Sequence, residues 1–227
     1  MMLWNEHYPS DKEMIMDIAA VLNEEYKELA KAGCKVIQIE EPVHHFNCQM
    51  EPPASDSDLK FYNEAFNRQV KDVETEIWAH TCWGNPNQQS FYWERPSYDR
   101  ALDYFLDMKC DVIDLECASN QARDAALFKN VDLKKYGKKI GIGVVDHTRT
   151  TVESPEMVAD TIRRALEFIP EDRLVITADC GFGREGLSRR IAYYKCVSLV
   201  LGTNIVRSEL GLEEKYVAAS DNSYSFS

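Results

Sequence analysis

The sequence lacks any apolar run near the ~20 residues that a membrane-spanning helix needs, and its first residues lack the basic start and apolar middle of a signal peptide. Basic side chains are also in deficit, with 26 Lys and Arg against 38 Asp and Glu, which gives a net charge of -12. Binding a phosphate backbone requires clustered cations, so this balance argues against nucleic acid. We therefore expect a cytoplasmic protein with neither a membrane nor a nucleic-acid partner.

Two further absences concern cysteine spacing and glycine. The 7 cysteines are odd in number and scattered, unlike the dense even spacing of a secreted disulfide scaffold, so we expect reduced thiols. No Gly-rich phosphate-binding fingerprint follows any strand-like run, which disfavours a dinucleotide-binding sheet. The proportions of hydrophobic (44%) and charged (28%) residues are typical of a folded globular protein.

Short β-branched runs alternate with amphipathic helical segments along the chain. The pattern predicts strands within 34–42, 75–81, 111–116, 138–146 and 173–179, and helices within 10–33, 58–73, 97–109, 120–128, 155–169 and 186–202. Ser10 and Glu13 form a capping box at the start of the first helix, and Ser154 with Pro155 opens the fifth. Such alternation predicts an α/β fold with a parallel sheet, since helical crossovers join parallel neighbours.

Polar residues cluster at the C-terminal end of every predicted strand, which favours a (β/α)8 TIM barrel over a doubly wound sheet. The strands account for only about the last five βα units of such a barrel. We expect residues 1–227 to form a single domain, the C-terminal part of a TIM barrel, with residues 220–227 as a frayed tail. The other units are then either absent from this sequence or supplied by another chain.

Four potential metal ligands lie at these strand ends: His80, Cys82, Glu116 and Cys180. His80 and Cys82 are two residues apart, so in a strand their side chains point the same way. One imidazole, two thiolates and one carboxylate form a donor set that suits Zn²⁺. Taken singly, each residue also has a structural interpretation, as a buried histidine, a buried thiol or a helix-capping acid.

The segments VIQIEEP, AHTCWGN, DVIDLE, IGIGVVD and VITADCGFGREG, in this order, carry a family resemblance. Between about residues 5 and 212 the chain resembles the catalytic barrel of cobalamin-independent methionine synthase and its shorter relatives, including the epoxyalkane:coenzyme M transferases. The resemblance implies that His80, Cys82, Glu116 and Cys180 bind zinc. It also implies alkyl transfer to a zinc-bound thiol, such as methyl transfer to homocysteine.

The resemblance implies roles for other residues, with two departures. Glu40-Glu41-Pro42 stands where methionine synthases carry Asp-Glu-Pro, whose first acid would hold the amino group of the substrate. Thr148 occupies the place of the proton-donating histidine, and His147 lies one position earlier, where an extended strand would turn it the other way. We take His147 and Asp146 as the catalytic candidates. The substrate-binding candidates are Glu40, Glu41, His44, Asn85 and Thr148, with Arg149 and Arg184 as anion-binding candidates and Trp83, Trp93 and Phe182 as a possible apolar wall.

Three functions stay open on the sequence alone. The first is zinc-dependent methyl transfer to a thiol, the second is epoxide opening by a thiol, and the third is a non-catalytic or truncated metal-binding homologue. The fold by itself does not choose, since uroporphyrinogen decarboxylase has a related barrel with no metal. The expected partners are a small-molecule thiol and an alkyl donor, with a corrinoid methyl-carrier protein as one candidate donor, and a homo-oligomer is allowed.

Overall fold

A computed structural model describes residues 5–84, 96–183 and 187–220 of the chain. It divides into two compact units, the first of residues 1–80 with 100–112 and the second of residues 81–99 with 113–227. The boundary crosses one strand after His80 and another after Val112, so each unit is described separately.

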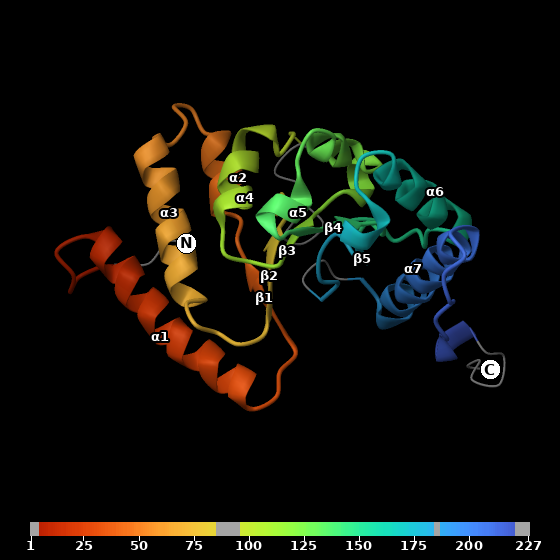
Figure 1. Cartoon of the computed structure of the whole chain (residues 1–227), viewed down its shortest axis with the longest axis horizontal. Helices are drawn as coiled ribbons and strands as arrows, with labels where there is room; N and C mark the ends of the chain where they lie inside the picture. The colour runs from red at the N-terminus through yellow and green to blue at the C-terminus, as the bar shows by residue number, and fades with distance from the viewer. Residues whose placement is uncertain (1–4, 85–95, 184–186, 221–227) are drawn as a thin grey trace. The chain divides into compact units, whose positions relative to one another are not determined.

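The first unit contains α1 (Asp11–Lys31), β1 (Val36–Glu40), α2 (Val43–Cys48), α3 (Asp56–Gln69), the body of β2 (Glu76–Thr81), η2 (Asp99–Ala101) in part, and α4 (Leu102–Asp107). Helices α1 and α3 begin at capping serines: the Ser10 hydroxyl accepts the Glu13 amide, and that of Ser55 accepts the Asp58 amide. Helices α1 and α3 pack side by side (Figure 1), and an ion pair of 2.7 Å joins Lys12 to Asp58 across them.

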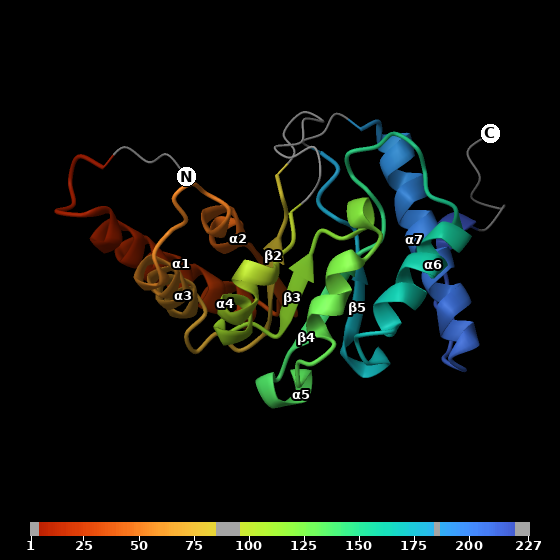
Figure 2. The same cartoon turned by 90° about the horizontal axis from the view of Figure 1, so that it is seen from above.

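The second unit contains β3 (Val112–Leu115) except its first residue, η3 (Ala118–Asn120), η4 (Arg123–Phe128), α5 (Leu133–Tyr136), β4 (Lys139–Gly143), α6 (Pro155–Leu166), η5 (Glu171–Arg173), β5 (Leu174–Thr177), α7 (Arg189–Glu209) and η6 (Ala218–Ser220). Helices α6 and α7 lie against one another in both views (Figures 1 and 2). Gly202 permits this close approach, because a Cβ there would lie 2.5 Å from the Pro155 carbonyl oxygen.

The strands belong to one five-stranded sheet in the order β1-β2-β3-β4-β5. Pairing is parallel, with Glu40 opposite His80 in β1 and β2, and Gly143 opposite Thr177 in β4 and β5. Strands β3 and β4 are almost wholly buried, as expected for central parallel strands. Sequence neighbours are therefore sheet neighbours, and their carboxyl ends lie at the same edge.

Buried Lys195 on α7 fixes the loop that follows β4. Its ammonium donates to the two Glu153 carboxylate oxygens at 3.0 and 2.8 Å and to the Thr151 carbonyl oxygen at 2.6 Å. The Lys195 side chain has no exposed surface, so its charge depends on this pairing. Glu153 in turn accepts the backbone amide of Asp146 at 2.9 Å, which links α7 to a predicted catalytic residue.

All five predicted strands are confirmed, whereas one helical prediction needs correction and one short helix was not predicted. The helix expected within 120–128 is a 3-10 helix, Arg123–Phe128, preceded by left-handed Gln121 (φ 58°) and Ala122 (φ 59°), which interrupt regular α-helical backbone. The short helix α2 was not predicted, because its sequence VHHFNC has no amphipathic period; it begins where the Glu41 carboxylate accepts the Val43 amide at 3.2 Å.

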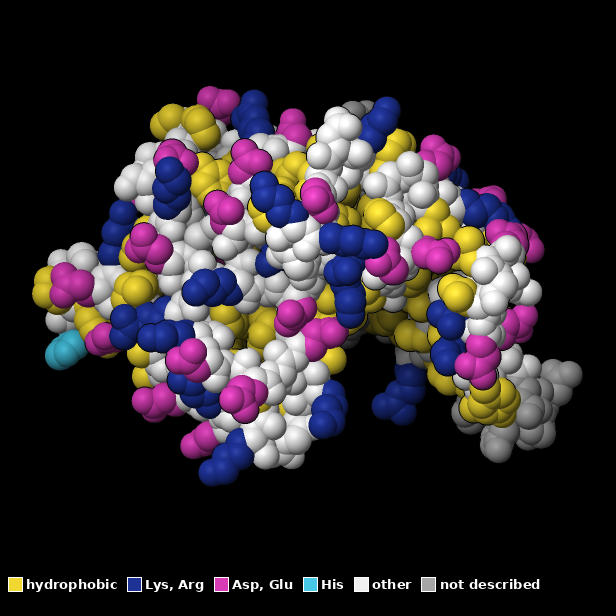
Figure 3. Space-filling model, viewed as in Figure 1, with side chains coloured by type: hydrophobic (Ala, Val, Ile, Leu, Met, Phe, Trp, Pro, Cys, Tyr) yellow, Lys and Arg dark blue, Asp and Glu magenta, His cyan; other side chains and the backbone are white. Residues whose placement is uncertain are grey.

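Surface charge agrees with the acidic but mixed composition. On the face of the first unit drawn in Figure 3, basic and acidic side chains are interspersed, so this face has no large basic patch of the kind that nucleic acid requires. Within the described part of the chain, no helix has both the length and the apolar character needed to cross a membrane.

Candidate metal centre

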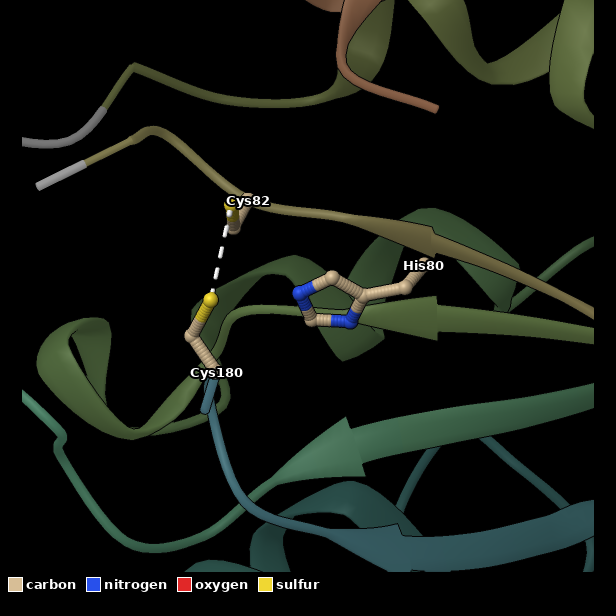
Figure 4. A group of neighbouring side chains, drawn as sticks. All are labelled: His80, Cys82 and Cys180. Atoms are coloured by element: carbon tan, nitrogen blue, oxygen red, sulfur yellow. Dashed lines mark hydrogen bonds between the residues drawn. The ribbon is translucent and has the colours of Figure 1, made fainter. Parts of the chain in front are cut away.

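Cys82 and Cys180 lie just beyond the ends of β2 and β5, and their thiols meet. The two Sγ atoms are 3.8 Å apart, although the residues are separated by 98 positions (Figure 4). The hydrogen bond with Cys180, followed by burial, raises the pKa of the Cys82 thiol, and the nearby Glu116 carboxylate raises it further. These effects favour the protonated form of the Cys82 thiol in the metal-free chain.

His80 is the third member of the group. It is buried in β2, two residues before Cys82, and the imidazole and the two sulfurs offer ligand atoms that all lie within 4.8 Å of one another. Figure 4 shows the imidazole directed toward the two thiols. Strand β2 ends at Thr81, so Cys82 lies just outside it, yet both side chains still reach the same place.

The spacing of the thiols fits a tetrahedral metal ion. Two sulfurs that are each ~2.3 Å from one ion, at tetrahedral angles, lie ~3.8 Å apart. The observed separation equals this value and is far longer than the ~2.05 Å of a disulfide. Together with the imidazole, the donor atoms are therefore suited to hold a thiophilic cation such as zinc.

Glu116, the fourth predicted ligand, lies directly after β3 and is fully buried. Its Oε2 accepts the backbone amide of Trp83 at 2.7 Å, and its Oε1 accepts the Ser119 hydroxyl at 3.5 Å. The Trp83 hydrogen bond connects Glu116 to the residue that follows Cys82. The carboxylate thus borders the thiol pair, while the close group itself consists of His80, Cys82 and Cys180.

Asp179 has a positioning role that the sequence did not reveal. Its fully buried carboxylate accepts the backbone amides of Cys117 at 2.8 Å, Ala118 at 2.7 Å and Ser119 at 3.2 Å. Gly143 makes room for it, because a Cβ there would lie 2.0 Å from Asp179 Oδ1. The only sequence signal was an acid next to Cys180, which any strand end can carry.

A second group joins Asp146, His147 and Asp179, all buried, with ligand atoms within 4.8 Å of one another. Strand β4 ends at Gly143, so residues 146–148 form a turn, and the strand alternation expected to turn His147 away does not apply. Neither ring nitrogen of His147 has a hydrogen-bond partner within the described residues. Burial, then the charge of Glu116, raises the pKa of Asp179 well above its usual range.

The remaining predicted residues have varied surroundings. Thr148 donates its hydroxyl and its amide to Asp146 Oδ1 at 2.6 and 2.8 Å, and Arg149 pairs with Oδ2 at 3.2 Å. Glu40 is largely exposed, with Oε2 3.9 Å from His80 Nε2. Glu41 lies 3.5 Å from the ring of His44, which is fully buried beside Tyr104 and Phe105.

The predicted aromatic residues and loop residues differ in their surroundings. Trp83 is fully buried, and its ring packs at 4.8 Å from that of Tyr98, so it belongs to the core of the second unit. Phe182 is half-buried. Asn85, Trp93 and Arg184 lie outside the described residues.

Parallel α/β architecture with a thiol and imidazole group at the strand ends defines a candidate metalloprotein of the barrel class. Residues 5–196 match the family described as cobalamin-independent synthase, catalytic domain. The chain belongs to this family.

Curated relatives agree with this assignment. The chain is 39% identical over 212 residues to a methionine synthase of Thermococcus kodakarensis and 38% identical over 210 residues to one of Saccharolobus solfataricus. These alignments cover 93% and 91% of this chain but 55% of each relative, so the chain spans about half the length of the curated relatives it matches.

Solved structures support the fold. A B12-independent methionine synthase from Shewanella sp. W3-18-1, in complex with selenomethionine, aligns with a TM-score of 0.72 and 28% identity over 91% of this chain and 58% of that one. A putative enzyme of the same kind from Listeria monocytogenes has a TM-score of 0.53 at 16% identity, over 86% of this chain and 56% of that one, and supports the fold alone. The prediction of a partial (β/α)8 barrel is confirmed.

The anchoring role of Asp179 is testable by Asp179→Asn. The amide keeps one acceptor oxygen and places an NH2 group against backbone donors, so we expect a loss of roughly 1–3 kcal/mol of stability. Thermal unfolding and amide hydrogen exchange measure this, with faster exchange at Cys117, Ala118 and Ser119. Asp160→Asn, the same change at an exposed site on α6, serves as control. Unchanged exchange at the three amides would contradict the anchoring role.

Proposed function

We propose that this chain carries the catalytic metal site of a zinc-dependent methyltransferase that transfers a methyl group to a thiol such as homocysteine. The observation that carries the proposal is the group of His80, Cys82 and Cys180, whose ligand atoms lie within 4.8 Å of one another. Family membership supports the direction of the chemistry, because the curated relatives are methionine synthases.

His80, Cys82 and Cys180 would hold the ion, with Glu116 as the exchangeable oxygen ligand. When bound, zinc supplies a Lewis acid that lowers the pKa of a substrate thiol and so provides a thiolate at neutral pH. Two protein thiolates keep such a site electron-rich, which favours a sulfur nucleophile over a metal-bound hydroxide. The relative solved with selenomethionine, a selenium analogue of methionine, supports this choice of substrate.

The leaving group of the methyl donor needs a proton, and His147 is the residue proposed to give it. Its imidazole is 1% exposed, and its ligand atom lies within 4.8 Å of the carboxyl oxygens of Asp146 and Asp179. Thr148 donates two hydrogen bonds to Asp146 Oδ1 and thereby fixes this carboxylate beside the His147 imidazole.

Purified chain should contain about one zinc ion per molecule, measured by atomic emission. Cys82→Ser or Cys180→Ser removes one thiolate, so we expect zinc affinity to fall by at least an order of magnitude with the fold retained. Cys34→Ser, at an exposed cysteine, is the matched control. A folded wild-type chain that takes up no zinc even when zinc is supplied would rule out this proposal and the epoxide alternative together.

A thiol-alkylation assay separates the enzyme classes. Homocysteine and coenzyme M are each offered with methyltetrahydrofolate, a methylated corrinoid protein and small epoxides, and the thioether product is identified by mass spectrometry. S-methylated homocysteine supports the proposal, and the productive donor identifies the partner. An epoxide adduct of coenzyme M would favour the epoxide-opening alternative, and zinc uptake without consumption of any thiol would favour a non-catalytic homologue. A cytoplasmic location and a homo-oligomeric state stay predictions.

Replacing the proton donor should slow methyl transfer without removing the metal. We expect His147→Gln to lower turnover by roughly 10²-fold or more, since general acid catalysis typically contributes 10²–10⁴-fold. Zinc content should stay at the wild-type level. His7→Gln, at an exposed histidine, is the control and should leave turnover unchanged. Equal turnover of His147→Gln and wild type would remove His147 from the mechanism.

A further inference from the structure

A small pocket lies at the carboxyl end of β4, entirely within the second unit. It is bounded by the loop after β3, the loop after β4 and helix α6, with a volume of about 270 Å³. This volume is slightly below the usual size of small-molecule sites and suits a group as large as one amino acid. Asp146 and Ser119 line it, and Ser119 contacts Glu116 at 3.5 Å, so the pocket adjoins the proposed catalytic residues.

Three carboxylates line the pocket, and each of them already has a cationic partner. The three pairs are Asp146 with Arg149 at 3.2 Å, Glu153 with Lys195 at 2.8 Å, and Asp160 with Arg163 at 2.6 Å. Pairing lowers the negative potential that these acids would otherwise impose on a bound anion. The acids of the pocket therefore do not exclude a negatively charged ligand.

Arg164 is the exception among the charged residues of the pocket. Its Nη1 donates to the side-chain oxygen of Gln121 at 2.7 Å, a neutral acceptor, and within the described residues it forms no ion pair. Its positive charge is thus available to a ligand. A planar guanidinium favours a carboxylate or phosphate, which it can bind through two parallel hydrogen bonds.

The backbone beside Arg164 is held in a costly conformation. Gln121 and Ala122 are consecutive non-glycine residues with φ of 58° and 59°, a left-handed conformation that residues with a Cβ atom rarely adopt. This turn carries the Gln121 amide to the guanidinium. Strained backbone concentrates at ligand-binding sites, and here it orients the one cation in the pocket without an acidic partner within the described residues.

We propose that this pocket binds a carboxylate group of a substrate, with Arg164 as its principal partner and Arg149 as the second guanidinium at the site. The identification of the ligand as a substrate rests on the proposed methyl transfer. Two sources supply the same chemistry: the α-carboxylate of an amino-acid thiol, and a carboxylate-bearing tail of the methyl donor.

Calorimetric titration distinguishes the two sources. Zinc-loaded chain is titrated with homocysteine, and, in a separate arm, with N-acetylglutamate, which carries carboxylates but no thiol. We expect Arg164→Gln to lower the affinity for one of these ligands by about tenfold or more. Arg164→Lys should lower that affinity less, because lysine keeps the positive charge but loses the two parallel hydrogen bonds of the guanidinium. The ligand that responds identifies the source of the carboxylate.

Arg190→Gln is the matched control, being the same change at an exposed arginine of α7, whose guanidinium lies over the Tyr194 ring and does not line the pocket. It should leave both affinities within about twofold of wild type. Equal affinities of wild type and Arg164→Gln for both ligands, or no saturable binding of either, would overturn the pocket assignment.

The experiment distinguishes failure of the methyl-transfer proposal from failure of the pocket assignment. The N-acetylglutamate arm, repeated on metal-free chain, needs neither zinc nor catalysis. If no thiol is methylated but this binding still depends on Arg164, the pocket stands and the methyl-transfer proposal fails. If methyl transfer occurs while neither ligand responds to Arg164→Gln, the transfer stands and the pocket assignment fails.

Discussion

Two thiols from positions 82 and 180 meet at 3.8 Å, and a short chain of hydrogen bonds holds them there. The amide that follows Cys82 donates to Glu116, and the residues after Glu116 donate three amides to Asp179. Asp179 precedes Cys180 directly. The ends of β2, β3 and β5 are therefore joined through two buried carboxylates, and the thiol contact depends on both of them.

The two buried carboxyl groups, Glu116 and Asp179, also influence the pKa values of the groups around the site. The hydrogen bond with Cys180, then burial, raises the pKa of Cys82, and burial raises that of Asp179; the charge of Glu116 adds to both shifts. A dication bound at this group would displace protons from the thiols. Zinc binding, as proposed, would therefore depend on the position of the buried Glu116 carboxylate.

Much of this arrangement was accessible from sequence, because parallel strands bring their carboxyl ends to one edge and the candidate ligands directly follow apolar runs. The close approach of His80, Cys82 and Cys180 agrees with that argument. The anchoring role of Asp179 was not accessible, since it depends on amides about 60 residues away. The turn at His147 was not accessible either, because the sequence does not show that β4 ends at Gly143, and the left-handed turn at Gln121 has no glycine to signal it.

X-ray absorption at the zinc edge of the zinc-loaded chain shows whether these side chains bind one thiophilic ion. We expect two sulfur scatterers at ~2.3 Å and two nitrogen or oxygen scatterers at ~2.0–2.1 Å, with one sulfur lost in Cys180→Ser. A zinc environment made only of nitrogen and oxygen, or a spectrum that Cys180→Ser leaves unchanged, would contradict it.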